Sequence, residues 1–317
     1  MQVEKATLDD LLRAVLSKLL RTRSRIRPTK GSATEVTGVL LKLAKPRARL
    51  SHSETKGTVF SCLGEFLWYL AKSNKLDFIS YYLKHYKKFS DDGQTIHGAY
   101  GPRLFAMRGE NQIANVIARL RRKPSSRQAV VQLFDAKDIV REYKDVPCTC
   151  TLQFMIRKGR LHMFVYMRSN DAFIGLPHDV FSFTMIQEIV ARSLDVDVGT
   201  YNHAVGSLHL YKVHRDAARR YLREGWQPTK PMPPMPVGNP WKAISQLVAA
   251  ERVIRFGGWI DIDALRLADY WKDLLRLLKV FSHYKLRQSG EIGRLKSNMS
   301  VRIYDSYIED KRRGAER

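Results

Sequence analysis

Residues 168–183 read RSNDAFIGLPHDVFSF, and this stretch decides how the rest of the sequence is interpreted. Four polar residues stand in a row from Arg168 to Asp171, a Gly-Leu-Pro turn follows, and His178 and Asp179 then open an apolar run. A solvated loop accounts for the arginine and the first aspartate. It does not account for a second polar pair placed directly before residues typical of a hydrophobic core. The stretch therefore predicts polar side chains held between two hydrophobic segments.

The composition is that of a globular protein with a substantial core. The chain has 317 residues, of which 44% are hydrophobic, enough for one large domain or two smaller ones. We find no apolar run of about 18 residues, so no membrane span is expected. The start MQVEKATLDD has no apolar signal region, so we expect a cytoplasmic protein. The cysteines Cys62, Cys148 and Cys150 suit neither a disulfide framework nor a zinc site, and no metal is expected.

The net charge of +24 indicates an affinity for anions. Such a charge can attract nucleic acid, acidic membranes or small anionic metabolites, and it is also compatible with a basic face that only solvates the protein. The basic residues are spread over LLRTRSRIRPTK, ARLRRKPSSR and EDKRRGAER, and no known nucleic-acid motif organises them. A nucleic-acid partner therefore remains possible but is not the favoured interpretation.

Hydrophobic periodicity predicts alternating helices and strands. Apolar residues recur at helical spacing over residues 7–20, 58–72, 74–89, 111–121 and 179–194. Strands are predicted over residues 34–44, 150–156, 161–167 and 203–211, with a hairpin turn at 157–160. Asn74 suits a helix N-cap, and the glycine-rich segment 90–102 suits a loop.

A proline-rich segment divides the chain. Residues 227–240 contain six of the twelve prolines and predict a stiff extended connector. Beyond it, Asn239-Pro240 is a good helix start, Gly257-Gly258 ends that helix, and another is expected over residues 263–281. The expected organisation is a main domain over 1–226, a linker over 227–240 and a helical extension over 241–317.

Four segments together resemble one family. They are GEFLWYL with Glu65, VPCTCTLQF with Cys148, RSNDAFIGLPHD, and VGSLHLY with His209 and Tyr211. In order and spacing they are similar to the thymidylate synthase superfamily over residues 5–215, in particular to its deoxycytidylate and cytidylate 5-hydroxymethylase branch. The resemblance implies an α+β fold, in which a mixed sheet flanked by helices dimerises face to face. It also implies a homodimer with 5,10-methylenetetrahydrofolate as the co-substrate.

Cys148 is the candidate nucleophile. Carbon 5 of a pyrimidine is a poor nucleophile until a thiolate adds at carbon 6 and gives an enolate-like ring that attacks a one-carbon donor. The resemblance puts the family's nucleophile at Cys148, and Arg168 would favour the thiolate and also hold the nucleotide phosphate. The alternative for Cys148 is an inert buried thiol; Cys62 and Cys150 are expected to be of that kind.

Further roles are implied by the resemblance. Glu65 corresponds to the general acid/base, with a core carboxylate paired to a buried arginine as the alternative. Two hydrogen bonds to the sugar would come from His209 and Tyr211, which lie two apart on a strand, or these are simply core residues. The phosphate clamp would comprise Arg168 and Ser169, Arg127 from a partner subunit (Gln128 departs from the family's second arginine) and Arg27, which could also be a solvated loop residue. The remaining implied roles concern Tyr100 (water at carbon 5), Gln153 and Asn170 (base and its water), Asp171 and Gly175 (pterin), and Tyr86 (facing the reactive methylene).

Asp179 is expected to select the base. Synthases acting on deoxyuridylate carry Asn at the matching position, and an amide complements the N–H and carbonyl of uracil. A carboxyl group can accept from the amino group of cytosine and share a proton with ring nitrogen 3, whereas ionised it would face the uracil carbonyl without a donor. This predicts a cytidylate or deoxycytidylate substrate at about 10- to 100-fold selectivity. Asp179 could instead be a helix N-cap.

The predicted reaction is one-carbon transfer to carbon 5 that ends in a hydroxymethyl group. The closing C-terminal segment that excludes water in synthases has no counterpart here, since the chain continues through the proline-rich connector and ends RRGAER. Two alternatives remain open: a methylating synthase, and a catalytically idle, basic nucleic-acid-binding relative.

Overall fold

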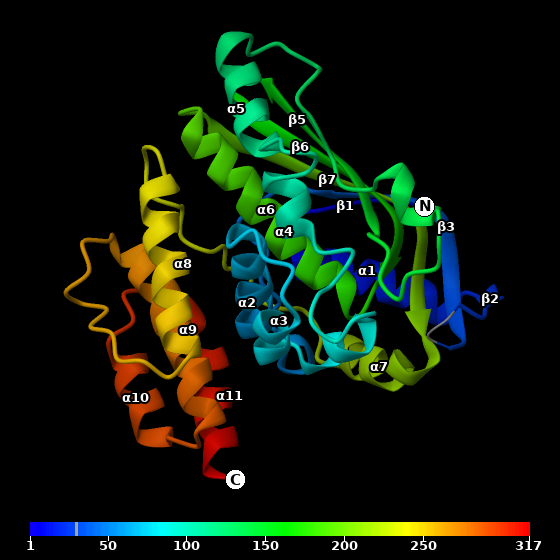
Figure 1. Ribbon diagram of the computed structural model, residues 1–317. Helices are drawn as coiled ribbons and strands as arrows, with labels where there is room; N and C mark the ends of the chain where they lie inside the picture. Colours follow the sequence, from blue (N-terminus) through cyan, green and yellow to red (C-terminus); the bar gives the residue numbers. More distant parts are fainter. Residues whose placement is uncertain (29–30) are drawn as a thin grey trace.

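The computed structural model describes residues 1–28 and 31–317, and a mixed sheet forms the centre of that part of the chain (Figure 1). The strands are β1 (Gln2–Lys5), β2 (Arg25–Ile26), β3 (Ala33–Leu43), β4 (Val130–Gln132), β5 (Thr149–Arg157), β6 (Arg160–Asp171) and β7 (Asp197–Tyr211). Their order is β1-β3-β7-β6-β5-β4, and β2 pairs with β3. β1 is parallel to β3 and β6 is parallel to β7, whereas the other neighbours are antiparallel.

Eleven α-helices are present in the described part of the chain, and those before α8 pack around the sheet and cover one of its faces. They are α1 (Leu8–Arg21), α2 (Val59–Leu70), α3 (Leu76–Tyr82), α4 (Tyr100–Phe105), α5 (Gln112–Arg122), α6 (Gly175–Ser193), α7 (Arg215–Arg223), α8 (Trp241–Arg255), α9 (Asp269–Lys285), α10 (Ser289–Ser297) and α11 (Asp305–Glu316). α6 is buried all round because β6 and β7 contact one side and α2 contacts another. Along β6 buried and exposed residues alternate, and Phe164 and Tyr166 are exposed, so the other sheet face is open.

The C-terminal helices form a separate layer. Figure 1 shows α8 to α11 together, on the side of α2 that faces away from the sheet. α2 contacts α6 as well as α8 and α9, so the helix that carries Glu65 lies between the sheet-bound layer and the C-terminal layer. No helix in the described part of the chain is long and apolar enough to cross a membrane.

The expected α+β fold, a mixed sheet flanked by helices with further helices at the C-terminal end, is confirmed, and several elements differ from the prediction. The predicted helix 74–89 is wrong as one element, because the chain leaves the helical region at Leu83 (φ −134°, ψ 82°) and continues as a 3₁₀ helix over Lys84–Phe89. The N-cap is Lys75 rather than Asn74. The expected loop 90–102 gives way to α4 from Tyr100 onward. α9 is displaced from the predicted 263–281, and β1, α10 and α11 were not predicted.

The proline-rich segment 227–240 is packed against the main domain. Met232 and Met235 in this segment are each 1% exposed. The N–H of Met232 donates to Arg47 O at 2.8 Å, and that of Met235 donates to Glu188 Oε1 at 3.0 Å. The segment has no helix or strand, as expected, but it is anchored by buried side chains and backbone hydrogen bonds. The division into 1–226, 227–240 and 241–317 stays a prediction.

A buried ion pair is expected to contribute strongly to stability. The side chains of Arg49 and Glu188 are both 0% exposed and form an ion pair, and Glu188 also accepts the Met235 N–H. Replacing Glu188 with Ala should lower the free energy of unfolding by about 3–5 kcal/mol, since it leaves a buried guanidinium without its partner. Urea denaturation measures this. Glu291→Ala, which removes one partner of the exposed ion pair with Arg294, is the control. It should lower the free energy of unfolding by about 0.5 kcal/mol or less. Equal losses would contradict the prediction.

Candidate active site

The thiol of Cys148 lies beside the guanidinium of Arg168 because of the β5–β6 hairpin. The strands are antiparallel, so the start of β5 pairs with the end of β6. Arg168 Nη2 is 3.9 Å from Cys148 Sγ, while its Nε and Nη2 donate to Pro147 O and Val146 O, each at 2.9 Å. Two backbone carbonyls therefore fix the cation next to the half-buried thiol, an arrangement that favours a thiolate.

Glu65 on α2 and His178 on α6 form a buried ion pair. His178 Nδ1 is 2.6 Å from Glu65 Oε2, the Tyr86 hydroxyl donates to Oε1 at 2.5 Å, and His178 Nε2 is 3.2 Å from Ser61 Oγ. Burial alone would raise the pKa of Glu65, but the hydrogen bond and charge of His178 outweigh it, so the pKa is lowered. Burial would lower the pKa of His178, yet Cys62 and Glu65 raise it to about 10. The carboxylate is thus ionised at neutral pH, and its partner is a histidine instead of the arginine considered from the sequence.

Asp179 ends a chain of buried hydrogen bonds. Asn170 Nδ2 donates to Asp179 Oδ2 at 2.7 Å, His203 Nε2 is 3.2 Å from Asn170 Oδ1, and the Tyr201 hydroxyl is 2.7 Å from His203 Nδ1. Burial, together with the charge of Glu65, raises the pKa of Asp179 to about 8. α6 begins at Gly175, so Asp179 lies inside the helix, and the N-cap alternative is wrong.

His203 is expected to make stability fall on the acid side. Burial lowers the pKa of His203 from 6.5 to about 3. The unfolded chain therefore binds a proton that the folded chain does not bind, and the free energy of unfolding should fall as pH drops from 6.5 toward 3, by about 1.4 kcal/mol per pH unit. His203→Phe should remove this contribution, as measured by urea unfolding between about pH 5 and pH 7. A variant with the wild-type slope would contradict this explanation.

Tyr100, His209 and Tyr211 border the same region. The Tyr100 hydroxyl is 3.1 Å from Thr149 N and 3.0 Å from Thr149 Oγ1, one residue after Cys148. Burial and the charge of Asp179 hold the pKa of Tyr100 well above its usual value. The rings of His209 and Tyr211 on β7 meet edge to face with centroids 4.9 Å apart. Tyr100 is thus next to the start of β5, and His209 pairs with Asp171 at the end of β6, the strand that carries Arg168.

The turn from β6 to α6 uses Asp171 and Gly175. Asp171 Oδ1 accepts the N–H groups of Phe173 at 2.8 Å and Ile174 at 3.0 Å, so one oxygen of this candidate pterin ligand holds the turn. A Cβ at Gly175 would lie 3.0 Å from Asn170 Nδ2 and 3.4 Å from Asp179 Oδ2. Glycine at this position therefore leaves room for the Asn170–Asp179 pair. Ser169 is half-buried on β6, one residue before that pair.

Three predicted residues lie outside this cluster. Arg27 is exposed in the loop after β2, and Arg127 is exposed just before the edge strand β4. Gln153 on β5 donates from Nε2 to Arg127 O at 2.9 Å, so it accompanies the edge strand rather than Asp179. Of the residues predicted for the phosphate clamp, only Arg168 and Ser169 therefore lie next to Cys148 within one chain.

Sequence reasoning missed His178, His203 and Tyr201 as members of the cluster. His178 stood in the quoted stretch next to Asp179, but its partner Glu65 is 113 residues away in the chain. Tyr201 and His203 could have been found from their spacing, since they lie two residues apart on β7 and point to the same side of the sheet. The same spacing leads on to His209 and puts polar side chains among buried residues of this strand.

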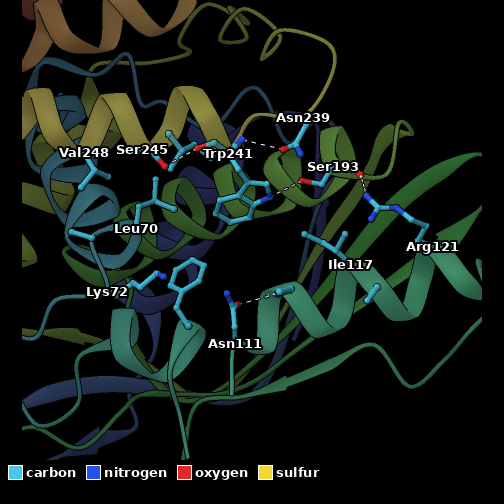
Figure 2. Close-up of a pocket in the computed structure, with 15 residues that line it drawn as sticks. Leu70, Lys72, Asn111, Ile117, Arg121, Ser193, Asn239, Trp241, Ser245 and Val248 are labelled. Atoms are coloured by element: carbon cyan, nitrogen blue, oxygen red, sulfur yellow. Dashed lines mark hydrogen bonds between the residues drawn. The ribbon is translucent and has the colours of Figure 1, made fainter. Parts of the chain in front are cut away.

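A well-defined cavity lies elsewhere in the described part of the chain. Figure 2 shows it between α5 and α8, with Trp241, Leu70, Ile117 and Val248 among its lining residues; its volume is about 640 Å³. Trp241 Nε1 donates to Ser193 Oγ at 3.1 Å and holds α8 against the end of α6. No candidate catalytic residue lines this cavity. The candidate active site is therefore identified from the chemistry of its side chains and not from the volume of a cavity. The described residues contain no group of three or more His, Cys, Asp or Glu side chains placed to hold a metal ion.

Comparison with known proteins shows the family of the chain. The sequence model of thymidylate synthase matches residues 7–252. The chain belongs to the thymidylate synthase family. This family takes 5,10-methylenetetrahydrofolate as its one-carbon donor and binds a nucleoside monophosphate. The match runs past the proline-rich segment into α8, and α9 to α11 lie beyond it.

Several phage proteins of the thymidylate synthase family are similar to the chain. They bear the name deoxyuridylate hydroxymethyltransferase. The protein of Pseudomonas phage M6 is 35% identical over 180 residues, covering 56% of this chain and 51% of the relative. Those of Delftia phage PhiW-14 and Bacillus phage SP01 are each 30% identical, over 207 and 211 residues, covering 61% and 62% of this chain and 57% and 55% of the relatives. The chain thus spans only about half the length of these curated relatives.

Proposed function

We propose that the protein transfers a one-carbon unit to carbon 5 of a cytosine nucleotide, dCMP or CMP, and yields the 5-hydroxymethyl nucleotide. The observation that carries this proposal is the Cys148 thiol, half-buried and 3.9 Å from a guanidinium that two backbone carbonyls fix in position. A thiolate is the group that the addition at ring carbon 6 requires, and a guanidinium beside the thiol favours that form. Arg168 and Ser169 next to it suit the nucleotide phosphate.

The residues divide the chemistry among them. Cys148 Sγ forms a bond to ring carbon 6, which lets carbon 5 attack the one-carbon donor. Carbon 5 then loses its proton to a water bound by Tyr100, and the bond between the new methylene and the folate nitrogen breaks, so that tetrahydrofolate leaves and an exocyclic methylene remains on the ring. Glu65, ionised and paired with His178, takes the proton of the water that adds to the exocyclic methylene. The carbon–sulfur bond then breaks and releases the thiolate and the hydroxymethyl nucleotide.

The residues at the turn between β6 and α6 suit the binding of the folate co-substrate. 5,10-Methylenetetrahydrofolate supplies the one-carbon unit when it is bound. Lys56 is buried with its Nζ 4.1 Å from the centre of the Phe173 ring, and burial lowers its pKa to about 8 although the charge of Asp171 opposes this. A cation, an aromatic ring and a carboxylate in one place suit a flat ring with polar edges. Asp171 and Gly175 would hold the pterin, and Tyr86 would face the methylene from its bond to Glu65.

Asp179 supports cytosine for a reason that differs from the one drawn from the sequence. Because its pKa is about 8, the carboxyl carries its proton at neutral pH and offers one donor and one acceptor. A neutral carboxyl can therefore complement either base, depending on which oxygen faces ring nitrogen 3. Cytosine gains an additional interaction, since its ring nitrogen 3 can take the proton and turn the contact into a charge-assisted pair. Uracil has no basic ring nitrogen that could accept the proton.

Deoxyuridylate is the second candidate substrate. The observation that favours it is the name of the phage relatives, deoxyuridylate hydroxymethyltransferase. The same names support a hydroxymethyl product rather than a methyl product for either base. Incubation with 5,10-methylenetetrahydrofolate and dCMP, followed by mass spectrometry, tests the proposal. Addition of one CH₂O unit is expected, and addition of one CH₂ unit would indicate a methylating synthase instead.

Replacing Asp179 with Asn should shift the preference from cytosine toward uracil nucleotides. An amide keeps one donor and one acceptor but has no proton to give to ring nitrogen 3. The ratio of kcat/KM for dCMP over dUMP should therefore fall about 10-fold, the difference between a neutral and a charge-assisted hydrogen bond. Steady-state kinetics with both nucleotides measures it. A ratio that stays at the wild-type value would mean that Asp179 does not select the base.

A homodimer is supported by the open sheet face. Phe164 and Tyr166 on β6 expose apolar surface there, and Arg127 and Gln153 lie toward the same edge of the sheet. Face-to-face packing of two sheets would cover the aromatic side chains and bring the Arg127 of one subunit to the phosphate clamp of the other. Analytical ultracentrifugation of the full chain tests the dimer.

A further inference from the structure

The hydrogen-bond chain behind Asp179 has a direction, and this direction bears on the choice of base. Its members are Tyr201, His203, Asn170 and Asp179, all buried. Each middle member has one donor end and one acceptor end, so the chain can be arranged in two opposite ways. In one arrangement Asp179 Oδ2 accepts from Asn170 and the carboxyl proton is on Oδ1. In the other, Oδ2 carries the proton and donates to Asn170.

The hydroxyl of Tyr201 favours the first arrangement. Tyr201 is 0% exposed, and within residues 1–28 and 31–317 its hydroxyl has a single hydrogen-bond partner, His203 Nδ1, at 2.7 Å. If Tyr201 donates to Nδ1, then His203 Nε2–H donates to Asn170 Oδ1, and Asn170 Nδ2 donates to Asp179 Oδ2. In the reverse arrangement the tyrosine proton would be buried without an acceptor, which is unfavourable.

The direction of the chain determines which oxygen of Asp179 carries the proton. With Oδ2 bonded to Asn170, the proton is on Oδ1, and a base that meets Oδ1 must accept a hydrogen bond there. Ring nitrogen 3 of cytosine is an acceptor, whereas ring nitrogen 3 of uracil carries a hydrogen. Because Gly175 has no Cβ, Asn170 and Asp179 can meet directly beside its backbone. This close packing also fixes the pair in position.

We propose that Tyr201 and His203 are specificity-determining positioning residues, which orient Asn170 so that Asp179 presents a proton donor to the base and thereby favours cytosine nucleotides. This inference rests on the proposed function, since it assumes that a pyrimidine nucleotide occupies the site next to Asp179. The two residues act through Asn170 and need not touch the base.

Isothermal titration calorimetry of Tyr201→Phe with dCMP and with dUMP tests the proposal. The variant keeps the buried ring and removes the hydroxyl that sets the direction of the chain. The ratio of the two dissociation constants should move toward uracil by about 10- to 100-fold, the penalty of a buried donor without a partner. Tyr304→Phe is the matched control, because Tyr304 is 1% exposed and lies in the C-terminal layer, and its ratio should equal that of the wild type. If Tyr201→Phe does not fold, His203→Phe breaks the chain at its middle and is measured in the same way.

The outcomes separate this inference from the proposed function. A wild-type protein that binds neither nucleotide would refute the function, and the inference with it. Binding with a wild-type preference for dCMP and an unchanged ratio in Tyr201→Phe would overturn the inference alone. A wild-type preference for dUMP would overturn both the inference and the cytosine substrate of the proposed function, since a carboxyl that presents its donor to the base should favour cytosine.

Discussion

Cys148→Ala is expected to abolish turnover of cytosine nucleotides, with kcat reduced by about 10³-fold or more, because the covalent route at ring carbon 6 is lost. The Cys148 sulfur is a soft nucleophile that lies 3.9 Å from the Arg168 guanidinium. Release of the carbon 5 hydrogen should stop together with product formation, because both steps require the ring to be activated by addition at carbon 6.

Cys150→Ala is the matched control for this prediction. Cys150 lies two residues further on β5, is also half-buried, and its Sγ is 4.0 Å from Cys148 O. Its replacement should leave kcat within about threefold of the wild type, as for substitutions away from the reacting groups. Undiminished turnover in Cys148→Ala would rule out the covalent mechanism.

Glu65→Gln is expected to lower kcat by about 10²- to 10⁴-fold, the usual contribution of a general acid or base. Glutamine keeps the shape and can still accept from the Tyr86 hydroxyl, but it cannot take a proton from water and cannot balance the charge of His178. Nucleotide binding should change little, since Glu65 acts on water and protons and not on the phosphate. Stopped reactions under saturating substrate give kcat, and calorimetry gives the dissociation constant.

Glu251 on α8 offers a control with nearly the same surroundings. It is buried, accepts from the Tyr82 hydroxyl at 2.8 Å, and pairs with Arg255 at 2.8 Å. Glu251→Gln therefore measures what the loss of a buried carboxylate costs without proton transfer. If both variants lost activity equally, Glu65 would have only a structural role.

The elements that could be predicted from the sequence carry their own local signals. α1 and α5 follow amphipathic patterns with caps from Thr7 and Asn111, and the β5–β6 hairpin turns at Lys158 and Gly159, both with positive φ. α6 starts four residues before the prediction because Pro177 is tolerated in the first turn, where the N–H groups have no helical partner. The pairing of β1 with β3 depends on contacts distant in sequence, which local patterns do not contain.

In the candidate site, too, some features follow from local sequence and others depend on contacts between distant elements. Cys148, Arg168, Glu65 and Asp179 follow from motifs, and the hairpin explains why the first two are neighbours. The ion pair of Glu65 with His178 and the pKa of Asp179 depend on burial and on partners from other elements. For this reason the sequence could single out Asp179 as the candidate that selects the base, but it could not predict that burial raises the pKa of this carboxyl.

The most direct measurement is the release of tritium from carbon 5 of four labelled nucleotides, dCMP, CMP, dUMP and UMP, in the presence of 5,10-methylenetetrahydrofolate. Cytosine nucleotides should release the label fastest, and Cys148→Ala should release none. A faster release from uracil nucleotides would contradict the role given to Asp179, and no release from any of the four would contradict the proposed reaction as a whole.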